Sequence, residues 1–327
     1  MRRVFHADYV GDLDPLDYER ARLREIGAEL VVARCASKDE LIDNAAGAEV
    51  VWLEWVPPVD DYVLRALPDC RLVMRWGAGY DQIDVAAATE LGVAVANAPT
   101  YCTENVAEHA MAMLLAMTRG IAAGDAAMHS GRWRDTAVVH QRLAGRTLGI
   151  VGLGRIGRRV AELGTAFGCR IVASDVRADL EPPAGVRLTD LPQLMAEADF
   201  VTLHTVLNER SRHLVNAKLL AGAKPGMLLV NTSRGGVVDH AALLEAINAG
   251  TVAGAALDVF ETEPLPADSP LRSSPAIVLT PHEASSSVEA TDDLRAEMCD
   301  ATAQWFETGW TDSVVNPEVR TRMRPRA

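Results

Sequence analysis

Three polar side chains of complementary chemistry each follow a short apolar run in the second half of the chain: Arg234, Glu263 and His282. An arginine can grip a carboxylate through two parallel hydrogen bonds and polarise a neighbouring carbonyl. A histidine can pass a proton to or from an alcohol oxygen near neutral pH, and a carboxylate beside it fixes its tautomer. We therefore predict that these three residues are catalytic and interconvert a 2-keto acid and a 2-hydroxy acid.

A glycine-rich turn in the middle of the chain indicates where the hydride for such a reaction would come from. A strand-like run at 146–151 and an amphipathic helical pattern at 155–167 flank Gly152-Leu153-Gly154-Arg155-Ile156-Gly157. In this setting glycines let the backbone approach a pyrophosphate, and the helix N-terminus offers free N–H groups to the phosphates. The expected cofactor-binding residues of the turn are Gly152, Gly154, Arg155, Ile156 and Gly157.

Residues after the next two strand-like runs bear on the choice of cofactor. Asp175 stands where a carboxylate would accept hydrogen bonds from a ribose diol and repel a 2′-phosphate. Arg177 could reach such a phosphate, but the sequence favours NAD over NADP. His204, after the run at 200–203, is a candidate for the adenine side of the pocket, with a purely structural role as the alternative.

Composition limits the class of protein. The chain has 327 residues, of which 49% are hydrophobic, which suits about two domains. The net charge of −13 argues against a nucleic-acid surface. The five cysteines are scattered, no metal-ligand spacing occurs, and neither a leader-like segment nor an apolar run of membrane-spanning length is present. We expect a cytoplasmic protein without a metal, a nucleic-acid partner or a membrane partner.

Strand-like and helical patterns alternate along almost the whole chain, which predicts an α/β fold with two doubly wound parallel sheets. The longest helical pattern, about Thr103–Met128, lies between the two sheets, and a last one, about 286–308, is followed by no strand. Because a lone terminal helix makes no domain, we expect it to return to the first sheet. The expected domains are 1–99 with 285–327 for the substrate, and 100–284 for the dinucleotide.

Six motifs in this order resemble the D-isomer-specific 2-hydroxyacid dehydrogenases, including the phosphoglycerate dehydrogenases. They are Gly77-Ala-Gly-Tyr-Asp81, Val106-Ala-Glu-His109, 149–157, 231–239, 256–264 and Thr280-Pro-His282. The resemblance implies a Rossmann-type nucleotide domain inserted into a flavodoxin-like substrate domain. It implies that Arg234, Glu263 and His282 are catalytic, that the N–H groups of the loop Trp76–Gly79 receive the substrate carboxylate, and that Thr232 and Asp258 contact NAD. It also implies a homodimer built around the helix near Thr103–Met128.

The substrate and one alternative function stay open. Arg75 begins the loop Arg75-Trp76-Gly77-Ala78-Gly79, where a cation could pair with a phosphate or phosphonate on the substrate, or simply with a local acid. Glu283 beside His282 departs from the usual apolar residue of the family. The alternative function is an NAD(H)-binding corepressor or scaffold of the C-terminal-binding-protein type, which shares the fold.

Overall fold

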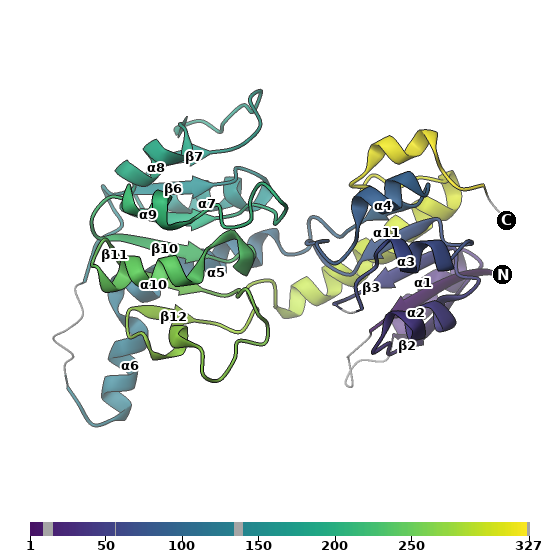
Figure 1. Ribbon diagram of the computed structural model, residues 1–327, viewed down its shortest axis with the longest axis horizontal. Coiled ribbons are helices and arrows are strands. Elements are labelled where there is room, and N and C mark those ends of the chain that lie inside the picture. The colour runs from purple at the N-terminus through teal and green to yellow at the C-terminus, as the bar shows by residue number, and fades with distance from the viewer. Residues whose placement is uncertain (9–15, 56, 134–139, 326–327) are drawn as a thin grey trace. The chain divides into compact units, whose positions relative to one another are not determined.

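The computed structural model describes residues 1–8, 16–55, 57–133 and 140–325, and they form two compact units (Figure 1). The first unit comprises Met1–Cys102 and Ser287–Ala327, and the second comprises Thr103–Ser286. The second unit is thus an insertion in the sequence of the first. No helix of the described part is long and apolar enough to cross a membrane.

The first unit contains a five-stranded parallel sheet in the order β2-β1-β3-β4-β5. This is the order of the flavodoxin-like doubly wound fold. The strands are β1 (Arg2–Ala7), β2 (Ala28–Ala33), β3 (Val50–Leu53), β4 (Leu72–Arg75) and β5 (Ala94–Ala96). The helices are α1 (Asp17–Glu25), α2 (Lys38–Ala45), α3 (Asp61–Ala66), α4 (Val85–Glu90) and α11 (Val288–Thr308), with the short helix η3 (Pro317–Thr321).

Apolar residues on both faces of this sheet form two cores. One core packs α2, α3 and α4 against one face, and the other packs α1 and α11 against the opposite face. Trp305 of α11 is fully buried, and Trp52 of β3 donates from Nε1 to Thr302 Oγ1 of α11 at 3.0 Å. The last long helix of the chain is therefore part of the first unit.

The second unit contains a seven-stranded parallel sheet in the order β12-β11-β10-β9-β6-β7-β8, the dinucleotide-binding arrangement extended by one strand. Its strands are β6 (Thr147–Val151), β7 (Arg170–Ser174), β8 (Val186–Leu188), β9 (Phe200–Leu203), β10 (Met227–Asn231), β11 (Val252–Leu257) and β12 (Ile277–Leu279). Its helices are α5 (Thr103–Arg119), α6 (Ile121–His129), α7 (Arg155–Ala166), α8 (Leu191–Glu197), α9 (Ala217–Ala221), α10 (His240–Asn248), η1 (Gly235–Val237) and η2 (Pro270–Ser273). The predicted fold class is confirmed.

The single helix predicted over Thr103–Met128 is wrong, because the structure has two helices there. Gly120 adopts φ +62°, a left-handed conformation that ends α5 and that a residue without Cβ adopts at little cost. The two helices also differ in burial: α5 buries an apolar stripe, whereas α6 exposes Ile121 (58%) and Met128 (54%). Figure 1 shows α6 projecting from the sheet of its unit.

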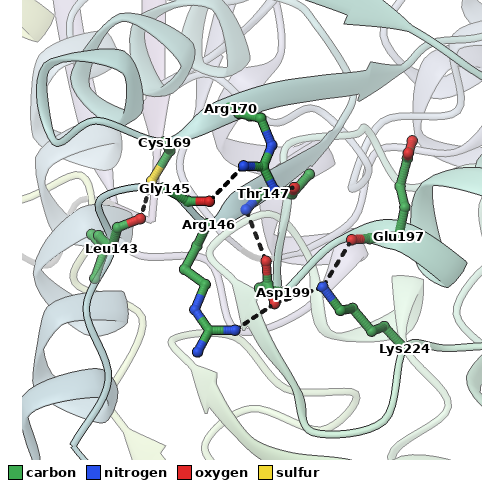
Figure 2. A network of polar contacts seen from close by, with 9 residues as sticks. All are labelled: Leu143, Gly145, Arg146, Thr147, Cys169, Arg170, Glu197, Asp199 and Lys224. Atoms are coloured by element: carbon green, nitrogen blue, oxygen red, sulfur yellow. Dashed lines mark hydrogen bonds and ion pairs between the residues drawn. The ribbon is translucent and has the colours of Figure 1, made fainter.

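A buried carboxylate organises the amino-terminal edge of the seven-stranded sheet (Figure 2). Asp199, just before β9, accepts hydrogen bonds from Lys224 Nζ (2.7 Å), Arg146 Nη1 (3.0 Å) and the Thr147 N–H (2.9 Å). Burial alone would raise the pKa of the Asp199 carboxyl, but these donors outweigh it and hold the pKa below its ordinary value. The carboxylate is therefore ionised in the folded protein and joins the start of β6 to β9.

We predict that Asp199→Asn destabilises the protein by about 1 kcal/mol at neutral pH, because it removes hydrogen bonds to two partly exposed cations. Since the folded pKa is depressed, this stabilisation is present above the unfolded pKa of about 3.9 and disappears as pH falls through the folded pKa. Urea unfolding midpoints should therefore differ at pH 7 and converge at acid pH. The exposed Asp268→Asn is the control. A difference that stays constant down to acid pH would contradict the role of the carboxylate.

Candidate active site

The three candidate catalytic residues follow three neighbouring strands of the second unit. Arg234 follows β10, Glu263 follows β11 and His282 follows β12, and these parallel strands are adjacent in the sheet. Because the carboxyl ends of parallel strands meet at one edge, the sheet brings their loops together. His282 Nδ1 lies 2.6 Å from Glu263 Oε2, which is hydrogen-bonding distance.

Both carboxylate oxygens of Glu263 have a hydrogen-bond partner. Its Oε1 accepts a hydrogen bond from the Phe260 N–H at 2.8 Å, while Oε2 faces His282. Burial alone would raise the pKa of the Glu263 carboxyl, but His282, the Phe260 N–H and the charge of Arg234 together lower it. The carboxylate is therefore ionised at neutral pH and orients the imidazole through Nδ1, which leaves Nε2 for chemistry.

His282 has a backbone conformation that few residues other than glycine adopt, with φ +56°. Its N–H donates to the Asp258 carbonyl oxygen at 2.8 Å. The fully buried Asp258 carboxylate accepts from Thr280 Oγ1 (2.6 Å) and from the N–H groups of Glu283 and Ala284 (both 3.0 Å). The turn that carries His282 is thus fixed by one residue at the end of β11.

Arg234 lies in a turn that packs closely against the Glu263 loop. The Arg234 carbonyl accepts from Asn231 Nδ2 at 2.9 Å, and its Nη1 donates to the Ser233 carbonyl at 2.8 Å. A Cβ on the next residue, Gly235, would overlap with the Phe260 backbone. The glycine therefore permits an approach of the two loops that no other residue allows.

The glycine turn after β6 has the geometry expected for a phosphate site. A Cβ on Gly152 (φ +93°) would collide with the His204 carbonyl, and one on Gly157 would collide with the Gly152 carbonyl. By contrast, nothing lies within 4 Å of the Cβ position of Gly154, and no side chain caps α7 there. The first N–H groups of α7, at Arg155, Ile156 and Gly157, thus lie at a positive helix end that no side chain caps.

Asp175 is paired with Arg177. Arg177 Nε and Nη2 each donate to the Asp175 carboxylate at 2.8 Å, and the Leu153 N–H donates to it at 2.8 Å. Arg177 foremost, with backbone N–H groups, holds the pKa of the Asp175 carboxyl well below its usual range, against the opposing effect of burial. The arginine that the sequence left as a possible phosphate ligand is thus committed to the carboxylate.

Two further predicted cofactor residues show different surroundings. Thr232, after β10, is 8% exposed, and its buried Oγ1 has no hydrogen-bond partner among the described residues. Burial lowers the pKa of His204 to about 3, so its ring is neutral, and Nε2 lies 2.9 Å from Thr202 Oγ1. An unpartnered buried hydroxyl and an open glycine turn fit a bound dinucleotide. The Nδ1 atom of His204 is also buried without a hydrogen-bond partner among the described residues.

The predicted substrate loop belongs to the first unit and follows β4. Trp76 N–H donates to the Leu53 carbonyl (2.7 Å) and Gly77 N–H to the Arg75 carbonyl (2.8 Å), so both are occupied. Over the residues that the structure describes, the N–H groups of Ala78 and Gly79 have no acceptor. These two are therefore the donors of the loop that remain for a carboxylate.

Sequence reasoning missed the supporting residue Asn97 and named His109 only as part of a motif. Asn97, at the end of β5, donates from Nδ2 to the Ala78 carbonyl at 2.6 Å, and its position after a strand is a signal that could have found it. His109 Nε2 lies 3.1 Å from Thr280 Oγ1 and thus supports the His282 turn from α5. Glu261 pairs with His213 and lies 3.6 Å from His240 Nδ1.

Two further points concern metal binding and the side chain of Glu283. Over residues 1–8, 16–55, 57–133 and 140–325, no group of three or more His, Cys, Asp or Glu side chains could hold a metal ion. Glu283, whose charge beside His282 was uncertain from the sequence, contributes its backbone N–H to Asp258 and exposes its side chain.

The chain belongs to the D-isomer-specific 2-hydroxyacid dehydrogenase family. The family description "D-isomer specific 2-hydroxyacid dehydrogenase, NAD binding domain" matches residues 111–284, more than half of the chain. The resemblance predicted from the motifs is therefore confirmed, and the second unit carries the NAD-binding domain of this enzyme family.

Three relatives show how broadly the chain is matched. It is 42% identical over 257 residues to a D-3-phosphoglycerate dehydrogenase of Mycobacterium bovis, covering 78% of this chain and 48% of that protein. The chain thus spans about half the length of that relative. It is 40% identical over 296 residues to a glyoxylate reductase of Korarchaeum cryptofilum, covering 88% and 89% of the two chains. The structure of an NADPH-dependent glyoxylate/hydroxypyruvate reductase from Sinorhizobium meliloti superposes with a TM-score of 0.85 at 30% identity, covering 100% and 99%.

We predict that Asp175→Ala weakens NADH binding by about tenfold, because the ribose loses a charged acceptor. The same change frees Arg177 and should strengthen NADPH binding. Fluorescence titration of both dinucleotides measures this. Asp179→Ala, which removes an exposed carboxylate nearby, is the control. Parallel weakening of both dinucleotides would show that Asp175 acts only through loop structure.

Proposed function

We propose that the protein is an NAD-dependent dehydrogenase that interconverts a small 2-keto acid and the corresponding D-2-hydroxy acid. The observation that carries the proposal is the Glu263–His282 pair, 2.6 Å apart, within the electrostatic influence of Arg234 at the carboxyl edge of the dinucleotide-type sheet. The names of the family and of its reductase relatives support the reaction class. The proposed domains are 1–99 with 285–327 for the substrate and 100–284 for NAD.

The roles of the residues follow from their chemistry. Arg234 binds the substrate carboxylate and polarises the adjacent carbonyl. In the first unit, the N–H groups of Ala78 and Gly79 are the donors that remain for a carboxylate. In the reducing direction the imidazolium of His282 gives the proton on Nε2 to the carbonyl oxygen as the new C–H bond forms, and it takes that proton back in the oxidising direction. Glu263 holds Nδ1–H throughout and stabilises the imidazolium.

When bound, the dinucleotide would supply the hydride as NADH and accept it as NAD⁺. We propose that the N–H groups at the start of α7 bind the pyrophosphate of the dinucleotide and that Asp175 binds a ribose. Thr232 Oγ1 makes a hydrogen bond to the same cofactor. Asp258 has three hydrogen bonds already, and its proposed contact with the carboxamide uses the acceptor capacity that a carboxylate retains beyond them. The preference for NAD over NADP rests on the Asp175 carboxylate.

The substrate panel is the experiment that tests this function. Purified protein with NADH should reduce glyoxylate, pyruvate or hydroxypyruvate. Chiral analysis of the lactate formed from pyruvate, or of the glycerate formed from hydroxypyruvate, should find the D-isomer. His282→Ala should lower kcat by about 100-fold or more while NADH affinity stays unchanged, because a general acid contributes on that order. The exposed His140→Ala, which lies outside α5 and α6, is the matched control. Tight NADH binding with no turnover over the whole panel would contradict the enzyme and favour the corepressor or scaffold.

We further propose a homodimer formed through α5 and α6, in the cytoplasm. The exposed Ile121 and Met128 side chains on α6 support a partner surface. The five cysteines are all free and buried, which fits a reducing compartment.

The dimer yields a separate prediction. Replacing Ile121 and Met128 together by Glu should raise the dimer dissociation constant by about 100-fold, because two carboxylates would take the place of apolar side chains in a buried interface. Sedimentation velocity over a concentration series measures it. Val206→Glu, another exposed apolar residue of the second unit, should leave association unchanged. A wild-type monomer, or equal effects of both variants, would refute an interface at α6.

A further inference from the structure

A buried histidine lies at the carboxyl edge of the first unit's sheet and has no role in the proposed reaction. His6, near the end of β1, is 0% exposed. Its ring stacks on Trp76 with centroids 4.6 Å apart and meets the edge of Trp52 at 5.7 Å. Trp76 begins the loop whose Ala78 and Gly79 N–H groups remain for a carboxylate. The buried His6 ring therefore packs against Trp76 of the proposed substrate loop.

An acidic side chain accompanies this histidine. Glu54 directly follows β3, and its Oε1 lies 3.1 Å from His6 Nε2. The Trp76 N–H donates to the Leu53 carbonyl, so Glu54 and Trp76 leave their strands side by side. The Glu54 side chain retains 13% exposure. Only the His6 ring, which pairs with Glu54 and stacks on Trp76, separates this carboxylate from the loop that we propose binds the substrate.

The cation nearest to this loop, Arg75, already contacts other groups of the protein. Arg75 is 4% exposed, its guanidinium lies 4.8 Å from the Trp55 ring centroid, and its Nη1 donates to the Trp76 carbonyl. A Cβ on Gly77 (φ +138°) would lie 2.7 Å from that Nη1. The guanidinium therefore supports the backbone of the loop and is covered by an aromatic ring.

The charges of this corner are unfavourable for a second anion. The Arg75 cation is 4% exposed and lies beneath the Trp55 ring, whereas the Glu54 side chain retains 13% exposure, so the more accessible of the two charges is negative. The indoles of Trp52 and Trp76, which contact the His6 ring, are neutral. A phosphate or second carboxylate placed there would meet like charge in a partly desolvated setting, which costs binding strongly.

We infer that Glu54 is a specificity determinant that restricts the substrates to 2-keto acids whose side chain carries no negative charge. The inference rests on the proposed function and names its substrate class. It departs from the sequence-based hypothesis that Arg75 binds a phosphate, which becomes one outcome of the test. In this assignment Arg75 is a positioning residue for the loop, and Glu54 faces the side chain of the substrate.

The test compares matched pairs of keto acids that differ by one anionic group: hydroxypyruvate against 3-phosphohydroxypyruvate, and pyruvate against oxaloacetate. The wild type should prefer the monoanion of each pair by about tenfold or more in kcat/KM. Glu54→Gln should reduce that preference by about tenfold, mainly through a lower KM for the two substrates that carry a second anionic group. The exposed Glu90→Gln of the same unit should leave it unchanged. A preference that Glu54→Gln does not alter would overturn the inference.

Two further measurements keep the result decisive if Glu54→Gln folds poorly. In the wild type, added salt should raise kcat/KM for the dianions relative to the monoanions, since it screens a repulsion. Arg75→Ala should reduce kcat/KM for both members of a pair to a similar extent. Selective loss of the phosphorylated substrate in Arg75→Ala, or a wild-type preference for it, would establish Arg75 as a phosphate ligand and refute the role of Glu54. If the wild type reduces no keto acid at all, the proposed function fails, and this inference fails with it.

Discussion

The buried carboxylate of Asp258 is the interaction on which the candidate site depends. It accepts hydrogen bonds from Thr280 and from two successive backbone N–H groups, and its own carbonyl accepts from the N–H of His282. One residue at the end of β11 thereby sets the path of the chain after β12. Without this anchor His282 would lose the position that places its imidazole 2.6 Å from Glu263. The chemistry is thus carried by exposed loops, but their geometry is determined by a charge with 0% exposure.

Close contacts between backbone segments fix the positions of other loops in the second unit. Gly235 lets the Arg234 turn lie against Phe260, and Gly152 and Gly157 let the turn after β6 close upon itself and upon His204. In each case a methyl group would force the loops apart, so the requirement is steric and local. The three loops belong to strands that are neighbours or near neighbours in the sheet, which concentrates their effect at one edge.

Much of this arrangement was predictable, because it depends on short-range patterns. Apolar runs predicted the strands, and polar residues in the loops after β10, β11 and β12 predicted Arg234, Glu263 and His282 at one edge. Other features depend on contacts that no local pattern encodes. The break at Gly120 requires a left-handed glycine inside a sequence that otherwise favours a continuous helix, and the short strand β8 has too few residues to show a period. The pairing of His6 with Glu54 joins residues 48 positions apart, where only the folded sheet brings them together. For Arg177 the residue type suggested a ligand contact, whereas an acid two positions away satisfies it.

The left-handed backbone of His282 limits how this site can diverge. At φ +56° most L-residues are strained, and β-branched side chains most of all, while asparagine and glycine are tolerated. Substitutions at position 282 are therefore limited both by the reaction and by the main-chain conformation, and the second limit does not depend on which reaction is catalysed. A descendant that lost its activity would still be expected to keep a small set of residue types here. The identity of the residue at 282 is consequently a record of backbone geometry as well as of chemistry.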